Sequence, residues 1–234
     1  MSSSTNIIAF LIAGAMVVGV FLVTSPGSDS RPESREEAGV LEGELFDDDI
    51  SDTFILMDWK VRERNSVGNP NAPIVMEQYS DYTCKFCFDF WRDVMPQLKA
   101  EFIDTGRVRY VYNDFISFGG QRAAEAAWCA EEQDAFWQYH DVLYSRFEFD
   151  RNRWDLPEVH GVYAKELGLD VERLVQCFQD RRYKGLVEES YSEALEKGIV
   201  GAPFFSINGK LIGGFRDFEF FKDILLEELG GRGQ

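Results

Sequence analysis

The chain has few of the residues that build metal sites and disulfide scaffolds. Its 234 residues include four cysteines and two histidines. Only Cys84 and Cys87 are closely spaced, and a tetrathiolate zinc site would need a second close pair of ligands, so we predict no metal. Four cysteines are also too few for a small disulfide-rich scaffold. They suit one reactive pair and one further bond in an oxidising compartment.

Basic residues are scarce as well. The chain has 24 Lys and Arg against 41 Asp and Glu, a net charge of −17. A nucleic-acid binder needs a basic face to meet phosphates, so this composition disfavours that class. Hydrophobic residues make up 45% of the chain and aromatic residues 15%, which favours a globular domain. The length is sufficient for one sizeable core with accessory segments.

The first 28 residues lack charged side chains. Residues 7–23 are apolar apart from glycines, and as a helix they would span about 26 Å, near the lower limit for crossing a bilayer. A cleaved signal peptide is the alternative. However, no basic residue precedes the apolar run, and Pro26 disfavours cleavage after Ser25. We therefore predict an uncleaved N-terminal transmembrane helix within residues 1–25, with a signal peptide as the open alternative.

An acidic stretch follows the apolar run. From Asp29 to Asp58, eleven acidic residues face only two arginines. Such a segment lacks the apolar surface needed to fold, and its charges repel one another. We predict a flexible linker over residues 26–52 that acts as a spacer, with a docking site for a partner as the alternative. The globular domain then occupies residues 53–234.

A Cys-x-x-Cys motif stands at the centre of the chain. The apolar run 74–76 predicts a strand, and apolar residues recur at helical spacing after Cys84-Lys85-Phe86-Cys87, so Cys84 is expected where a helix begins. The unpaired N–H groups and partial positive charge of a helix start favour a thiolate. This pattern indicates a thiol–disulfide exchange site with an exposed Cys84. Half of a zinc site and a purely structural disulfide are the alternatives.

A second informative stretch lies over a hundred residues later. Gly201-Ala202-Pro203 predicts a turn, in which a cis peptide before the proline is possible. The apolar residues 204–207 then predict a strand, followed by a tight Asn208-Gly209 hairpin turn and a return strand from Leu211.

These two stretches together resemble the thioredoxin superfamily. The helical segment between them is similar to that of the DsbA branch, the bacterial disulfide oxidoreductases, and the resemblance covers about residues 66–230. It implies a thioredoxin-like α/β fold with an inserted helical subdomain at about residues 117–198. Three further motifs are similar to the same branch: Tyr79-Ser80-Asp81-Tyr82-Thr83-Cys84, Trp128-Cys129-Ala130 and Phe136-Trp137-Gln138-Tyr139-His140-Asp141.

The resemblance also implies roles for individual residues. Cys84 and Cys87 would be the catalytic pair, Pro203 a cis-proline facing them, and Ala202 and Pro203 the border of a groove for substrate peptide. Related proteins often carry a second bond in the insert, and an oxidising compartment rarely leaves two thiols unpaired. We therefore expect a structural disulfide between Cys129 and Cys177.

Three positions depart from the family pattern. A buried Glu often stands six residues before the first cysteine, where this chain has Gln78. Glu77 is its neighbour, but adjacent strand residues point to opposite faces, so no buried carboxylate is expected to relay protons from Cys87. Lys85 replaces the usual proline, and Phe86 stands where many relatives have His or Tyr. Of these two active-site tuning residues, we expect Lys85 to stabilise the thiolate by its charge.

The secondary structure predicted around these motifs is mostly helical. His140 is expected to pack among aromatic residues. The segment Phe54–Trp59 is predicted as a first strand, and Asp217 is expected to cap a terminal helix. The helices expected in the insert are 121–132, alanine-rich and amphipathic, 135–147 with Asp134 as its cap, 156–167, 171–179 with Asp170 as its cap, and 183–197.

The predicted function is oxidation of exported proteins by dithiol–disulfide exchange, with the catalytic domain on the extracytoplasmic side of a single-pass anchor. A substrate thiolate would attack Cys84 to form a mixed disulfide, which the second substrate thiol resolves. No soluble cofactor is implied. By family analogy, a membrane quinone-linked partner of the DsbB or VKOR type re-oxidises the pair. The alternatives are a reductase or isomerase using the same cysteines, and a membrane-tethered peptide-binding module.

Overall fold

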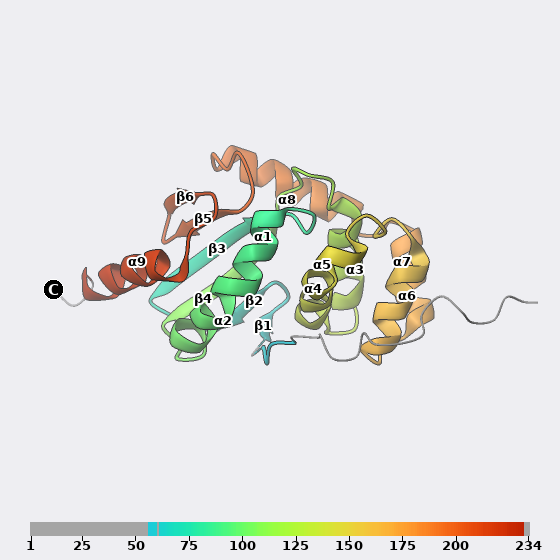
Figure 1. The fold of residues 1–234 in the computed structure, drawn as a ribbon, viewed down its shortest axis with the longest axis horizontal. Coiled ribbons are helices and arrows are strands. Elements are labelled where there is room, and N and C mark those ends of the chain that lie inside the picture. The colour runs from blue at the N-terminus through green and yellow to red at the C-terminus, as the bar shows by residue number, and fades with distance from the viewer. Residues whose placement is uncertain (1–55, 60, 232–234) are drawn as a thin grey trace, which may run out of the picture. The chain divides into compact units, whose positions relative to one another are not determined.

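The computed structural model describes residues 56–59 and 61–231 (Figure 1). The predicted transmembrane helix and the acidic linker, residues 1–25 and 26–52, lie outside the described residues. Within the described part of the chain, no helix is long and apolar enough to cross a membrane.

A six-stranded mixed sheet forms the centre of the fold. The two central strands run parallel, so that Ile74 lies opposite Val108 and Ser80 opposite Asp114. The hairpin at one edge turns through Asn208 and Gly209, both at positive φ, as the sequence predicts. In sheet order the strands are β1 (Val61–Glu63), β2 (Ser66–Gly68), β4 (Val108–Asp114), β3 (Ile74–Ser80), β5 (Phe204–Ile207) and β6 (Lys210–Gly213).

The prediction of a first strand at 54–59 is wrong for the part that the structure describes, because residues 56–59 form no strand. The backbone N–H of Met57 and the indole N–H of Trp59 both donate to Oδ2 of Asp141, each at 2.8 Å. The buried Asp141 side chain of the insert thus accepts hydrogen bonds from this segment, and no neighbouring strand pairs with residues 56–59. Pairing begins only at β1, which forms a short antiparallel hairpin with β2.

One helical segment follows the Cys-x-x-Cys motif, but it is not uniformly α-helical. It consists of α1 (Lys85–Asp89), a π-helical turn η1 (Phe90–Val94), α2 (Met95–Leu98) and a second π-helical turn η2 (Lys99–Ile103). Pro96 lacks a backbone N–H and therefore cannot continue the α-helical hydrogen-bond ladder. The wider turn η1 ends at Val94, two residues before this proline.

The predicted helical insert lies between β4 and β5 in the sequence; most of its helices lie on the side of the domain away from β6, and its last helix runs back toward β5 and β6 (Figure 1). The predicted N-cap Asp170 is confirmed, because its side chain accepts the N–H of Arg173. The predicted cap Asp134 is wrong, because Asp134 adopts a positive φ of 58° and Ala135 occupies the cap position. The helices are α3 (Gln121–Glu131), α4 (Phe136–Ser145), α5 (Phe147–Asp150), α6 (Pro157–Glu166), α7 (Val171–Gln179) and α8 (Lys184–Glu196).

The expected amphipathic character of α3 is not what the structure shows. Residues 123–130 are all buried, including Glu125. This helix packs against α4, α7 and α8, so neighbouring helices surround it. Small alanine side chains allow that close packing.

Aromatic rings hold the terminal helix α9 (Phe218–Gly231) on the sheet. The ring centroids of Phe90 and Phe205 lie 4.7 Å apart, and those of Phe205 and Phe221 lie 4.8 Å apart. The predicted cap Asp217 is confirmed, because its carboxylate accepts the N–H of Phe220 at 3.0 Å. The turn η1, which continues α1, and helix α9 therefore both pack on Phe205 of β5, which fixes the helical segment after the Cys-x-x-Cys motif relative to the sheet.

Candidate active site

The turn between β3 and α1 is held by one buried carboxylate. Asp81 accepts the backbone N–H and the hydroxyl of Thr83, at 2.8 and 2.7 Å, and the N–H groups of Ser117 and Phe118, at 2.9 and 2.7 Å. Its backbone carbonyl accepts the N–H of Cys84 at 3.0 Å. These bonds set Cys84 at the N-cap of α1, where the sequence predicts it.

Cys84 is less accessible than predicted, since only 3% of its surface is exposed. Its pKa is nevertheless lowered. The largest cause is a hydrogen bond from the Cys87 thiol, and the backbone N–H groups of Cys87 and Phe86 also lower it, while burial and the charge of Asp81 oppose the shift. The helix start thus acts on the thiolate through the backbone N–H groups of its first turn.

The pKa of Cys87 shifts in the opposite direction. Its side chain has no exposed surface. Burial and the adjacent Cys84 raise its pKa well above the usual range, while the Ser80 hydroxyl and the Asp81 backbone N–H oppose this. Both cysteines are free thiols in the structure. A thiolate therefore forms more easily at Cys84 than at Cys87.

The side chains of the two predicted tuning residues make other contacts than the predicted ones. The Lys85 ammonium forms an ion pair with Asp89 and lies 5.0 Å from the ring centre of Phe88. The predicted stabilisation of the thiolate by Lys85 charge is therefore not what the structure shows, since a carboxylate one turn later neutralises that charge. Phe86 leaves 59% of its surface exposed and acts on Cys84 through its backbone N–H.

The fold brings the second predicted stretch to Cys84. The peptide bond between Ala202 and Pro203 is cis. The Cys84 thiol donates a hydrogen bond to the Ala202 carbonyl oxygen at 3.4 Å. Cys84, Cys87, Ala202 and Pro203 thus lie at one site, although over a hundred residues separate the two cysteines from the other two.

A cavity of about 360 Å³ is lined in part by Thr83, the residue before Cys84, and sequence reasoning missed it. Gly120 lines it, and a Cβ at Gly120 would lie 2.1 Å from Oδ1 of Asp81, so only glycine fits there. In the sequence, the Gly119-Gly120 pair was the one sign of a close backbone approach at this place. The cavity is lined by Thr83, Phe118, Gly119, Gly120, Arg122, Ala123, Arg151, Asn152, Trp154 and Asp155.

A layer of polar side chains lies under Cys87, and sequence reasoning missed this layer as well. The Ser80 hydroxyl lies 2.8 Å from the Tyr144 hydroxyl and accepts the Gln78 amide at 3.2 Å. The Tyr110 hydroxyl donates to Gln78. The sequence offered one signal, the alternation of tyrosines in β4, which places Tyr110 and Tyr112 on one face.

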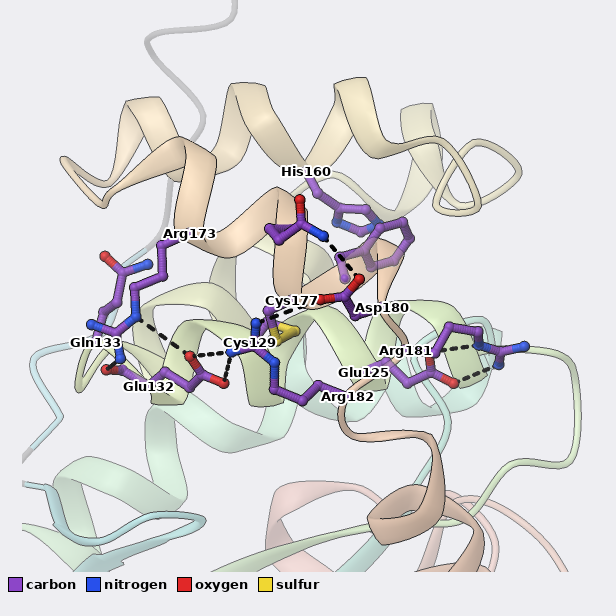
Figure 2. The surroundings of a disulfide bond; sticks show 12 residues. Glu125, Cys129, Glu132, Gln133, His160, Arg173, Cys177, Asp180, Arg181 and Arg182 are labelled. Carbon is purple, nitrogen blue, oxygen red and sulfur yellow. Dashed lines mark hydrogen bonds and ion pairs between the residues drawn. A yellow bond between two sulfur atoms is a disulfide. The ribbon is translucent and has the colours of Figure 1, made fainter.

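Cys129 and Cys177 form a disulfide that joins α3 to α7 (Figure 2). Ion pairs surround it. Glu132 binds Arg173 and Arg182, and the fully buried Glu125 binds Arg181 at 2.6 Å. The pairing agrees with what the resemblance implied, and it leaves Cys84 and Cys87 as the redox-capable pair of the described residues.

A thioredoxin family profile matches residues 60–227 of this chain. The chain belongs to the thioredoxin family. Disulfide bond formation protein D of Bacillus subtilis (strain 168) is 27% identical over 172 residues, which cover 71% of this chain and 77% of that protein. A probable disulfide bond formation protein D of Bacillus anthracis is 29% identical over 173 residues, covering 71% of this chain and 78% of that protein.

Solved structures of this family agree with the fold. BdbD from Bacillus subtilis, in its oxidised form, aligns with a TM-score of 0.66 at 25% identity, over 71% of this chain and 92% of that one. Wolbachia pipientis alpha-DsbA1 aligns with a TM-score of 0.64 at 25% identity, over 71% and 91%. The predicted thioredoxin-like fold with a helical insert is confirmed, and the chain is a DsbA-like protein-disulfide oxidoreductase.

Proposed function

We propose that the protein introduces disulfide bonds into exported polypeptides through Cys84 and Cys87. Oxidation of the substrate, rather than its reduction, is supported by the opposite pKa shifts of the two thiols. The pKa is lowered at Cys84 and raised at Cys87. A stabilised Cys84 thiolate favours the reduced pair. A thioredoxin-fold protein whose reduced form is stabilised is a strong oxidant.

The proposed reaction starts from the oxidised pair. A substrate thiolate attacks the Cys84 sulfur, the bond to Cys87 breaks, and Cys87 leaves with the bonding electrons. A second substrate thiolate then attacks the first substrate sulfur, and Cys84 leaves as a thiolate. Two electrons thereby pass from the substrate to the protein. Ala202 and Pro203 are proposed to border the substrate, supported by the 3.4 Å contact between Cys84 and the Ala202 carbonyl.

The proposed setting is the extracytoplasmic side of a membrane, with residues 1–25 as a single-pass anchor, residues 26–52 as an acidic linker and residues 53–234 as the catalytic domain. The apolar run 7–23 supports the anchor, and the disulfide between Cys129 and Cys177 supports an oxidising compartment. A quinone-linked membrane protein of the DsbB or VKOR type is the proposed re-oxidant.

The deciding measurement is the equilibrium potential of the Cys84–Cys87 pair in glutathione buffers. We expect a potential well above that of glutathione, because the Cys84 thiolate stabilises the reduced form. A potential well below that of glutathione would overturn the proposed direction, and the same cysteines would then serve a reductase. Retained exchange activity in a Cys84→Ser protein would reject the assignment of the reactive sulfur altogether.

A further inference from the structure

The cavity of about 360 Å³ near the cysteine pair has two walls. The first comes from the turn before Cys84 and from the start of α3, and includes Thr83 and Gly120. The second comes from the segment between α5 and α6, and includes Arg151 and Trp154. Because Thr83 directly precedes Cys84, a group bound in this cavity lies within reach of a peptide that is attached to Cys84.

The buried carboxylate of Asp81 holds the first wall in place. One of its oxygens accepts the N–H and the hydroxyl of Thr83, at 2.8 and 2.7 Å. The other oxygen accepts the N–H groups of Ser117 and Phe118, at 2.9 and 2.7 Å. A Cβ at Gly120 would lie 2.1 Å from this carboxylate, so the loop also packs directly against it. A wall fixed in this way loses little conformational freedom when a ligand binds.

Arg122 brings a positive charge to the cavity in a fixed position. Its guanidinium donates to Glu125 at 2.6 Å and to the Phe178 carbonyl oxygen at 3.2 Å, and it lies 3.6 Å from the centre of the Phe178 ring. These bonds use two of the five N–H donors of a guanidinium. Glu125 also binds Arg181 (Figure 2). One buried carboxylate thus serves two arginines, and these three side chains together keep one positive charge.

Positive side chains outnumber negative ones among the residues that line the cavity. Arg151 pairs with Glu148 at 3.3 Å, an exposed ion pair that water and salt screen. Asp155 is the one acidic residue of the lining, and no acidic residue lies in the first turn of α3. Asp155 also acts on an arginine outside the lining, because the hydrogen bond to Glu125 and then the charge of Asp155 raise the pKa of Arg181. The cavity therefore suits an anionic group.

We propose that this cavity is a subsite for an acidic side chain of the substrate polypeptide, within two residues of the cysteine that reacts with Cys84. The proposal rests on the proposed function and adds a sequence preference to it. Arg122 and Arg151 bind the carboxylate through charge-assisted hydrogen bonds. Phe118, which leaves 63% of its surface exposed, contacts the methylene groups of the same side chain. An extended peptide advances about 3.3–3.6 Å per residue, so a neighbouring side chain can span this separation.

The net charge of the chain predicts the opposite preference. At −17, the protein as a whole repels anionic peptides and attracts cationic ones. Faster reaction of acidic peptides than of neutral ones therefore requires a local positive site. The sign of the charge effect separates the proposed subsite from general electrostatic attraction.

The test uses the reduced full-length protein and short peptides whose single cysteine carries a neutral thiopyridyl group. The Cys84 thiolate attacks the peptide sulfur and forms a mixed disulfide, and the thiopyridyl group leaves with the bonding electrons, is protonated to thiopyridone and is followed by its absorbance. Glu, Gln or Lys stands in turn at each of the two positions on either side of the cysteine. Each rate is divided by the rate of the same peptide with mercaptoethanol, which corrects for the reactivity of the peptide itself.

In the wild type, Glu at one of these positions should react on the order of tenfold faster than Gln at the same position, and Lys should react more slowly than Gln. This measurement needs no variant. Equal corrected rates for Glu and Gln at every position would overturn the proposal. The order Lys, Gln, Glu, which the net charge alone predicts, would overturn it as well.

Arg151 and Arg153 provide a matched pair of variants. Both are arginines of the same segment and both pair with a nearby carboxylate, but only Arg151 lines the cavity. Arg151→Met should lower the ratio of the Glu rate to the Gln rate by roughly threefold. Arg153→Met removes the same charge and should leave that ratio unchanged. An unchanged ratio in Arg151→Met, or an equal loss in both variants, would overturn the proposal; urea unfolding shows that both variants are folded.

A failure of the proposed function would look different. Oxidation of a reduced two-cysteine peptide without acidic residues, by the oxidised protein, tests that function by itself. If this oxidation fails and no peptide reacts with Cys84, the proposed function is wrong and the subsite is rejected with it. If the oxidation proceeds but Cys84 reacts with every peptide at the same corrected rate, only the subsite is rejected.

Discussion

The Cys84 thiol donates to the Ala202 carbonyl oxygen at 3.4 Å, across 118 residues of sequence. The β3–β5 pairing fixes this contact, because β3 leads into the turn before Cys84 while β5 begins just after Pro203. Cys87 lies behind Cys84 with no exposed surface. An incoming sulfur can therefore reach Cys84 beside this carbonyl, while Cys87 stays protected from it.

This arrangement predicts that Cys87→Ala traps substrates. With a cysteine peptide supplied as its mixed disulfide with glutathione, the Cys84 thiolate would attack the peptide sulfur and release glutathione. No internal thiol would remain to release the bound peptide, so we expect a stable mixed disulfide, detected by non-reducing electrophoresis and located by mass mapping. Cys84→Ala is the matched control and should form none, since Cys87 is buried. An adduct on Cys87 in that control would contradict the assignment.

The ion pair between Lys85 and Asp89 leads to a second prediction. Lys85 is half exposed and its charge is balanced by Asp89, so Lys85→Met should shift the Cys84 pKa by less than roughly half a unit. Asp89→Asn removes the balancing charge and should lower the Cys84 pKa further. The ultraviolet absorbance of the thiolate, followed against pH, measures both. A large rise in Lys85→Met would show that its charge acts on Cys84 directly.

The strand–turn–helix around Cys84 and the Asn208-Gly209 hairpin could be predicted because each depends on short-range patterns. The layer of polar side chains under Cys87 could not, because its members come from β3, β4 and the insert, and only the folded chain brings them together. Local patterns also fail where two sites share them. Asp134 and Asp170 both precede helices, yet only Asp170 accepts a backbone N–H of the helix that follows.

This difference between the two aspartates can be measured. Asp170→Ala removes a side-chain cap and should lower the free energy of unfolding by about 1 kcal/mol. Asp134 has a φ of 58°, which glycine adopts without cost, so Asp134→Gly should not destabilise and should add about 0.5 kcal/mol. Urea unfolding of both variants tests this. A loss in Asp134→Gly as large as that in Asp170→Ala would mean that both residues act as caps.

The buried His160 predicts a loss of stability in acid. The neutral ring uses both nitrogens, with Nδ1 2.7 Å from the Tyr139 hydroxyl and Nε2 2.7 Å from the Trp154 carbonyl oxygen. Burial lowers its pKa to about 4. Below its ordinary pKa of about 6.5 the unfolded chain binds a proton that the folded protein does not, so the free energy of unfolding falls as the pH drops toward 4. The full effect is about 3 kcal/mol.

A comparison of variants isolates this contribution from the other titrating groups. His160→Gln keeps a polar side chain without a group that gains a proton in this range. Its urea unfolding energy should therefore depend less on pH between about 6.5 and 4 than that of the wild type. Tyr139→Phe removes one hydrogen bond but leaves the imidazole buried, so it should keep the wild-type slope. If His160→Gln and the wild type lost stability equally across this range, the acid sensitivity would have to come from other groups.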